Sequence, residues 1–200
     1  MRRALVALAL GEGLLWAFFA VPQNTTSAEP EVVPPPVVRE TRHVDLTTDG
    51  VVPQARPLWI SIEPGVLGVT ELHPDGVRAV GGVVVPADNR PAFRTDSNLP
   101  GTDSPGTTFI VGHNYADSSG ADVPFAALGK VAIGDAVVVG TETGTLVYDV
   151  RDVFRVPKDE LATRTDLLAN VPGRLILETC DTTPDGRDTF DNLVVITQLV

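Results

Sequence analysis

Apolar positions from residue 57 onward fall into short runs, rich in Val and Ile and separated by Gly, Pro and Asp. Eight of these runs have the length of β-strands: 58–62, 66–70, 82–86, 107–111, 136–140, 146–154, 174–178 and 193–199. Residues 137–147 place turn residues between two apolar runs, which is typical of a hairpin. Helical patterns are limited to 125–128 and about 159–168. Because eight short strands protect their edges best by closing on one another, the pattern predicts a mainly β domain over 57–200, a closed eight-stranded barrel with short helices.

The first 21 residues have a different pattern, in which Met1-Arg2-Arg3 precedes two apolar runs, Ala4–Leu10 and Leu14–Val21. Two arginines before an apolar segment favour insertion with the N-terminus inside, although Glu12 near its centre costs about 2.5–3.5 kcal/mol. No cleavage site stands out after Val21, so we expect a retained signal-anchor over 1–21; cleavage stays open. The protein is then expected at the extracytoplasmic face of the cell membrane on a single-pass anchor, or secreted if the segment is cleaved.

Residues 22–56 read as a flexible spacer. They contain six prolines, including Pro34-Pro35-Pro36, among polar residues. Proline-rich chain extends at about 3.1 Å per residue, so this segment could hold the folded domain clear of a membrane surface.

Length, net charge and cysteine content exclude several classes of function. The 200 residues suffice for one compact domain, and 26 acidic against 15 basic residues give a net charge of −11. Without a stripe of Lys and Arg the chain lacks the footprint of a nucleic-acid-binding protein. Its single cysteine can form neither an internal disulfide nor a Cys-rich zinc site, so it is either a buried apolar residue or a working thiol.

Two strand ends carry residues that could do chemistry together. Cys180 ends the apolar run that begins at Arg174 and precedes a polar loop, and His113 follows the run 107–111 almost directly. A Cys–His pair supplies a thiolate for nucleophilic attack and an acid that protonates a leaving amine. The alternatives are a structural cysteine and a hydrogen-bonded structural histidine. Metal binding is weaker, because one Cys and one His fill half of a tetrahedral shell.

Arg187 is the only basic residue after Cys180, seven positions downstream. A guanidinium there would suit the stabilisation of an oxyanion beside the thiol. The alternative is a solvated loop charge paired with Asp185, Asp188 or Asp191.

In order along the chain, these residues resemble the sortases, the cysteine transpeptidases of Gram-positive envelopes, and within them the actinobacterial class E and F branches. The resemblance spans Pro57 to Val200. It is carried by Pro100-Gly101 through Pro105-Gly106-Thr107, Phe109-Ile110-Val111-Gly112-His113, Pro124-Phe125-Ala126-Ala127-Leu128, Ile133-Gly134-Asp135-Ala136-Val137-Val138-Val139, Leu177-Glu178-Thr179-Cys180 and Asp191-Asn192-Leu193-Val194-Val195. Two positions depart from the family: Ile176 stands where the Thr-Leu-x-Thr-Cys motif begins with Thr, and Asn192 stands where an arginine often precedes the last strand.

The resemblance implies a sortase-like β-barrel that cleaves a Leu-Pro-x-Thr-Gly type sorting signal between Thr and Gly. Cys180 would attack the threonine carbonyl, His113 would protonate the departing amine, and Arg187 would hold the oxyanion or the substrate backbone. Thr179 and Asn192 are expected to line the substrate groove. The expected partners are proteins with a C-terminal sorting signal, a peptidoglycan precursor or pilin amine as acceptor, and the membrane through the N-terminal segment.

Two other functions stay open at this point: an envelope cysteine peptidase or hydrolase that resolves the thioester with water, and a non-catalytic envelope-binding module. Acidic loop residues such as Asp117, Asp122 and Asp181 could bind calcium, but such loops are usually only solvated, so we expect no required metal and no cofactor.

Overall fold

The computed structural model describes residues 46, 48, 50–80, 83–114, 123–183 and 187–200. The expected anchor over 1–21 and most of the expected spacer over 22–56 lie outside these residues. No helix within the described part of the chain has the length and apolar character that a bilayer crossing requires.

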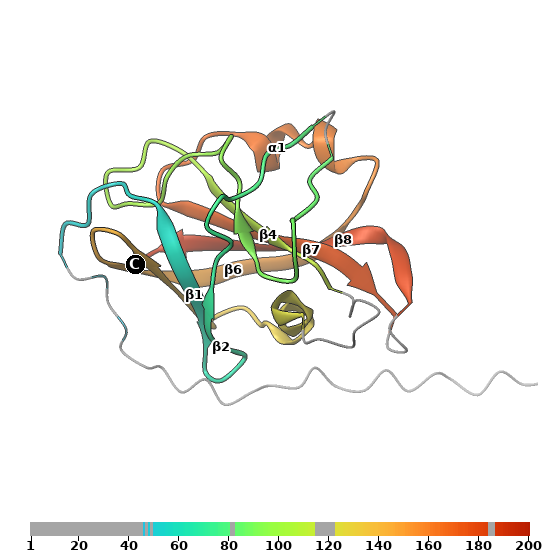
Figure 1. The fold of residues 1–200 in the computed structure, drawn as a ribbon, viewed down its shortest axis with the longest axis horizontal. Helices are drawn as coiled ribbons and strands as arrows, with labels where there is room; N and C mark the ends of the chain where they lie inside the picture. Colours follow the sequence, from blue (N-terminus) through green and yellow to red (C-terminus); the bar gives the residue numbers. More distant parts are fainter. Residues whose placement is uncertain (1–45, 47, 49, 81–82, 115–122, 184–186) are drawn as a thin grey trace, which may run out of the picture. The chain divides into compact units, whose positions relative to one another are not determined.

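One mixed sheet of eight strands forms the domain, in the order β2-β1-β5-β6-β8-β7-β4-β3 (Figure 1). All neighbouring strands are antiparallel except β4 and β7, which run parallel. The prediction of a mainly β, eight-stranded domain is therefore confirmed. The strands are β1 (Pro57–Glu63), β2 (Leu67–Glu71), β3 (Ala92–Phe93), β4 (Thr108–Gly112), β5 (Ala136–Thr141), β6 (Thr145–Pro157), β7 (Arg174–Thr182) and β8 (Asp188–Leu199).

The helices are short, as the sequence pattern predicted. Two are 3₁₀ turns, η1 (Pro124–Lys130) and η2 (Leu161–Thr163), and one is a single α-helical turn, α1 (Thr165–Leu168). The expected hairpin over 137–147 is also present, since β5 and β6 pair with Gly140 opposite Thr145.

The predicted barrel is not fully closed. Within the described residues no ladder joins the edge strands β2 and β3. Irregular chain after β2 bridges the gap instead: the His73 N–H donates to the Pro91 carbonyl (2.8 Å), the Val77 N–H donates to the Phe93 carbonyl (2.8 Å), and the Thr95 N–H donates back to the Val77 carbonyl (2.8 Å). The sheet is thus strongly curled, with single backbone hydrogen bonds across its seam.

One expected strand is wrong. Residues 83–86 of the apolar run 82–86 are not part of a strand, and the two-residue β3 takes the place beside β4. Val83 and Val85 are 62% and 64% exposed, and Pro86 has no N–H to donate to a ladder. An apolar run without a partner strand to bury it stays irregular, whatever its β propensity.

The sheet buries both of its faces. Ile110, Leu175, Leu177, Leu193 and Val195 turn into the main core, which η1 covers with Phe125 and Leu128. Their neighbours in the sequence, Phe109, Ile176 and Val194, turn to the other face and form a second cluster with Val156 and with Leu167 of α1. Because side chains alternate along a strand, one continuous apolar run serves two cores.

The last part of the expected spacer packs against the domain. Val52 is 2% exposed and belongs to the main core. Its N–H donates to the Thr102 hydroxyl (3.1 Å), and the Ala55 N–H donates to the Pro100 carbonyl (3.1 Å). The expected boundary after Arg56 therefore leaves part of the packed domain in the spacer, since a buried valine with paired backbone is not flexible linker.

Candidate active site

The parallel pair β4 and β7 brings the histidine and the cysteine together. In its register Gly112 lies opposite Thr179, and the Thr179 hydroxyl donates to the Gly112 carbonyl (2.8 Å). His113 follows Gly112, and Cys180 follows Thr179. Neighbouring strands lie about 4.8 Å apart, so two residues that are 67 positions apart in the sequence become neighbours at one end of the sheet.

Gly112 fixes where His113 begins. A Cβ atom at this position would lie 2.7 Å from two ring carbons of Phe125, which is closer than real Cβ contacts come. The absence of a side chain lets the ring of η1 pack directly on the end of β4. The chain can therefore leave the strand at this point with its backbone held between the Phe125 ring and the Thr179 hydroxyl.

The alternation of the strands decides which side chains share the site. On β7, Glu178 and Cys180 follow Ile176 on the face of the second cluster, while Thr179 turns to the main core. The same rule brings Val111 and His113 to this face from β4, and Asn192, which lies opposite Cys180, from β8.

These side chains line a pocket of about 530 Å³. Its walls are mostly aliphatic and come from the segment before β3, from β4 and from the short helices: Ala79, Val83, Val84, Val85, Pro86, Val111, Leu161, Ala162 and Leu168. Its polar residues are Arg94, His113, Lys158, Glu178, Thr179, Cys180 and Asn192. A pocket with aliphatic walls and few polar groups is the form that ligand sites usually take.

His113 is held from the side opposite the sheet. Its Nε2 lies 3.1 Å from the Pro86 carbonyl oxygen. A carbonyl can only accept, so we assign a proton to Nε2, which donates it to Pro86. Nε2 is therefore engaged by the segment that covers the pocket.

The Cys180 thiol is half-buried, and burial raises its pKa. Two negative charges, on Asp188 and Glu178, raise it further, whereas the positive charge of Lys158 lowers it. The strand end that carries the thiol is clamped by Asn114, whose amide donates to the Cys180 carbonyl (2.7 Å) and to the Thr182 hydroxyl (3.3 Å). The thiol is thus fixed in position and protonated at rest.

Both residues expected to bind substrate line the pocket, and both already have hydrogen-bond partners. The Thr179 hydroxyl is used by the Gly112 carbonyl. The Asn192 amide donates to Oε1 of Glu178 (3.1 Å). Glu178 is buried, and desolvation raises its pKa to about 7 against the opposing effect of the Arg94 charge.

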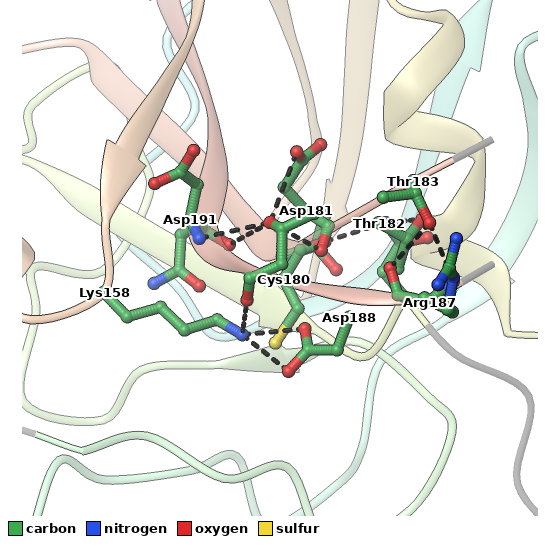
Figure 2. A network of polar contacts seen from close by, with 12 residues as sticks. Lys158, Cys180, Asp181, Thr182, Thr183, Arg187, Asp188 and Asp191 are labelled. Atoms are coloured by element: carbon green, nitrogen blue, oxygen red, sulfur yellow. Dashed lines mark hydrogen bonds and ion pairs between the residues drawn. The ribbon is translucent and has the colours of Figure 1, made fainter. Parts of the chain in front are cut away.

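Arg187 is not among the residues that line the pocket. It is exposed, and its backbone pairs with Thr183: the Thr183 N–H donates to the Arg187 carbonyl (2.8 Å), and the Arg187 N–H donates to the Thr183 hydroxyl (3.1 Å). Figure 2 shows its guanidinium beside Thr183, while the Lys158 ammonium and the Asp188 carboxylate lie beside the sulfur of Cys180.

Three residues of the site were missed in the sequence: Asn114, Lys158 and Glu178. Asn114 follows His113 directly and Glu178 lies within the cysteine motif, so adjacency was the available signal. Lys158 follows the expected strand 146–154 by four residues. Only the longer β6 observed here, which ends at Pro157, gives it a defined place.

Among the described residues, no group of three or more His, Cys, Asp or Glu side chains gathers in a way that could hold a metal ion. Of the three acidic residues considered for calcium, Asp117 and Asp122 lie outside the described residues. The Asp181 carboxylate accepts a hydrogen bond from Nε of Arg155 (2.9 Å).

Comparisons with known proteins agree with this fold. A family profile described as Sortase domain matches residues 78–200. Among solved structures, a lid mutant of sortase A from Corynebacterium diphtheriae is similar with a TM-score of 0.52 and 24% identity, over 72% of this chain and 71% of that chain. Sortase C-1 from Actinomyces oris gives a TM-score of 0.51 and 22% identity, over 71% and 72% of the two chains. Sortase C1 from Streptococcus agalactiae gives 0.52 and 21%, over 72% and 66%. At these identities the structural likeness concerns the fold. A search of curated proteins found no match.

Proposed function

Because the chain belongs to the sortase family of cysteine transpeptidases, we propose that it cleaves a Leu-Pro-x-Thr-Gly type sorting signal between Thr and Gly. It then transfers the acyl group to an amine of the cell wall or of a pilin. The observation that carries the proposal is the pairing of Gly112 with Thr179, which makes His113 and Cys180 neighbours in a pocket with aliphatic walls.

The reaction has two balanced halves. In the first, the Cys180 thiol gives its proton to His113, its sulfur forms a bond to the threonine carbonyl carbon, the bond to the glycine nitrogen breaks, and the resulting imidazolium gives a proton to the departing amine. In the second, an acceptor amine attacks the thioester and loses a proton to His113, and the thiolate leaves and takes that proton back. No oxidant, metal or nucleotide enters the balance.

The pocket is suited to an extended apolar peptide. Aliphatic walls would bury the leucine and proline of a sorting signal, while Thr179 and Asn192 are proposed to lie along the substrate backbone near the scissile bond. His113 becomes available when a bound peptide displaces the Pro86 carbonyl from Nε2, which couples proton transfer to substrate binding.

The proposed setting is the extracytoplasmic face of the membrane. Residues 1–21 would anchor the chain, and the proline-rich segment that follows would act as the spacer. Substrates with C-terminal sorting signals and envelope amines would both be reached there.

The test combines a peptide carrying the sorting motif with mass spectrometry of the protein. We expect a thioester adduct on Cys180, and a ligated product when a glycine-based amine is added. Cys180→Ala should give neither, with an unchanged circular dichroism spectrum. Hydrolysis that an added amine does not divert would contradict the transferase proposal, and turnover by Cys180→Ala would refute the nucleophile.

A further inference from the structure

The proposed reaction calls for a positively charged side chain beside the thiol. Attack by a thiol builds negative charge first on sulfur and then on the carbonyl oxygen, so a cation held in place beforehand lowers the barrier. Arg187 does not line the pocket, and the Asn192 amide is neutral and donates to Glu178. Two cations do line it, Lys158 and Arg94; the Arg94 guanidinium is paired with Asp96 (2.9 Å) and lies over the Phe109 ring, which leaves Lys158.

The sheet brings Lys158 to the thiol by the same alternation that selects the rest of the site. Phe154 and Val156 of β6 turn to the face of the second cluster, and Lys158 is the next residue of that parity. Its N–H donates to the Phe190 carbonyl (2.9 Å), which continues the pairing of β6 with β8 one step beyond the strand.

The side chain of Lys158 is fixed at its end. Nζ donates to both carboxylate oxygens of Asp188 (2.7 and 2.8 Å) and to the Thr189 carbonyl (2.8 Å). These three hydrogen bonds hold the ammonium against β8, the strand that pairs with β7 and therefore lies next to Cys180. Figure 2 shows this ammonium beside the Cys180 sulfur.

We infer that Lys158, and not Arg187, supplies the positive charge that stabilises the Cys180 thiolate, with Asp188 holding the ammonium in place and partly neutralising it. The inference rests on the proposed function in one respect: it takes Cys180 as the nucleophile. The charged or titratable groups that face the thiol from the neighbouring strands and segments are Lys158, Asp188, Glu178 and His113. Arg94 lines the same pocket, and Asp191 acts on Lys158 in turn.

The charges around the thiol act in opposite directions. Lys158 lowers the pKa of Cys180, and Asp188 and Glu178 raise it. Removal of the lysine charge therefore leaves burial and two carboxylates, all of which disfavour the thiolate. An adjacent opposite charge usually moves a pKa by about 1–3 units, and a partly exposed ammonium shared with a carboxylate belongs at the lower end of that range.

Alkylation of the thiol by iodoacetamide across a pH series tests the inference without a peptide substrate. The chain has one cysteine, so the rate reports Cys180 alone. In Lys158→Gln, whose amide can still donate to Thr189, the midpoint of the pH–rate profile should rise by about one pH unit. Lys158→Arg should restore the midpoint. Asp188→Asn, whose amide oxygen can still accept a hydrogen bond from Nζ, removes only the opposing charge and should lower the midpoint. Lys130→Met, which removes the other lysine of the chain from the exposed end of η1, is the matched control and should leave the midpoint unchanged.

A midpoint in Lys158→Gln equal to that of the parent protein overturns the inference, as does a rise in Arg187→Met of the kind expected for Lys158. If Lys158→Gln does not fold by circular dichroism, Lys158→Met takes its place under the same criteria, and a midpoint in Asp188→Asn that does not fall is refuting by itself. Shifted alkylation midpoints without turnover of any sorting peptide would support the role of Lys158 and count against the proposed transpeptidation, so the two failures are distinguishable.

Discussion

Replacement of Glu178 by Gln should change how the stability of the domain depends on pH. The Glu178 side chain is 9% exposed and lies in register between Val111 of β4 and Val194 of β8. Desolvation by these neighbours raises its pKa to about 7 from its ordinary value of 4.5, although the charge of Arg94 opposes the change. One unit of pKa difference between native and unfolded chains is worth about 1.4 kcal/mol, so ionisation of this carboxyl costs the fold about 3 kcal/mol.

The direction of the pH effect on the free energy of unfolding follows from whether the native or the unfolded state binds the proton more tightly. Below pH 4.5 Glu178 is protonated in both states and costs nothing. As the pH rises from 4.5 to about 7, the unfolded chain releases the proton while the native chain keeps it, so the free energy of unfolding falls. Above about pH 7 the full cost is present. A glutamine at this position can still accept a hydrogen bond from Asn192 and has no charge to bury.

Urea unfolding of the parent protein and of Glu178→Gln, near pH 5 and again near pH 8, measures this difference. The two proteins should be of similar stability near pH 5, and the variant should be more stable by about 3 kcal/mol near pH 8. Glu142→Gln, in the exposed turn between β5 and β6, is the matched control and should follow the parent protein at both pH values. A difference between Glu178→Gln and the parent protein that is the same at both pH values would refute the argument.

Two further variants test the packing around the site and at the domain boundary. Val52→Ala should lower the free energy of unfolding by about 1–3 kcal/mol in the same urea assay, because it opens a hole in the main core, whereas Val51→Ala, at a position 84% exposed, should change it by less than about 0.5 kcal/mol. Equal effects would restore the expected boundary after Arg56. Gly112→Ala should reduce kcat/KM on a sorting peptide by up to about 10²-fold, since its Cβ would push against the Phe125 ring and displace His113, while Gly129→Ala, where a Cβ meets no atom within 4 Å, should not. Full activity in Gly112→Ala would show that the close contact does not position His113.

The apolar runs and the turn residues between them were enough to predict seven of the eight strands, because those strands are long enough to carry their own pattern. It could not predict β3, whose two residues have no periodicity and are defined only by their pairing with β4. The run 82–86 failed for the opposite reason: its residues suit a strand, but residues 83–86 have no partner strand.

The site divides in a similar way. His113 and Cys180 could be selected from the sequence because each follows a buried strand, yet their proximity depends on the parallel register of β4 and β7, which no local pattern encodes. Arg187 was chosen because it is the only cation after the cysteine. Arg187 is near the cysteine along the chain, whereas Lys158 reaches the thiol from β6, across the intervening strand β8.

The position of β8 in the sheet has a consequence for the order in which the enzyme assembles. β8 is the last of the eight strands in chain order, yet it lies between β6 and β7 near the centre of the sheet. Without it, the strand ladders form two groups, one with β2, β1, β5 and β6, the other with β7, β4 and β3. The first part carries Lys158 and the second carries His113 and Cys180. A nascent chain that lacks β8 therefore has no ladder that places the proposed cation beside the nucleophile, and we expect this arrangement to form only when the final strand has docked.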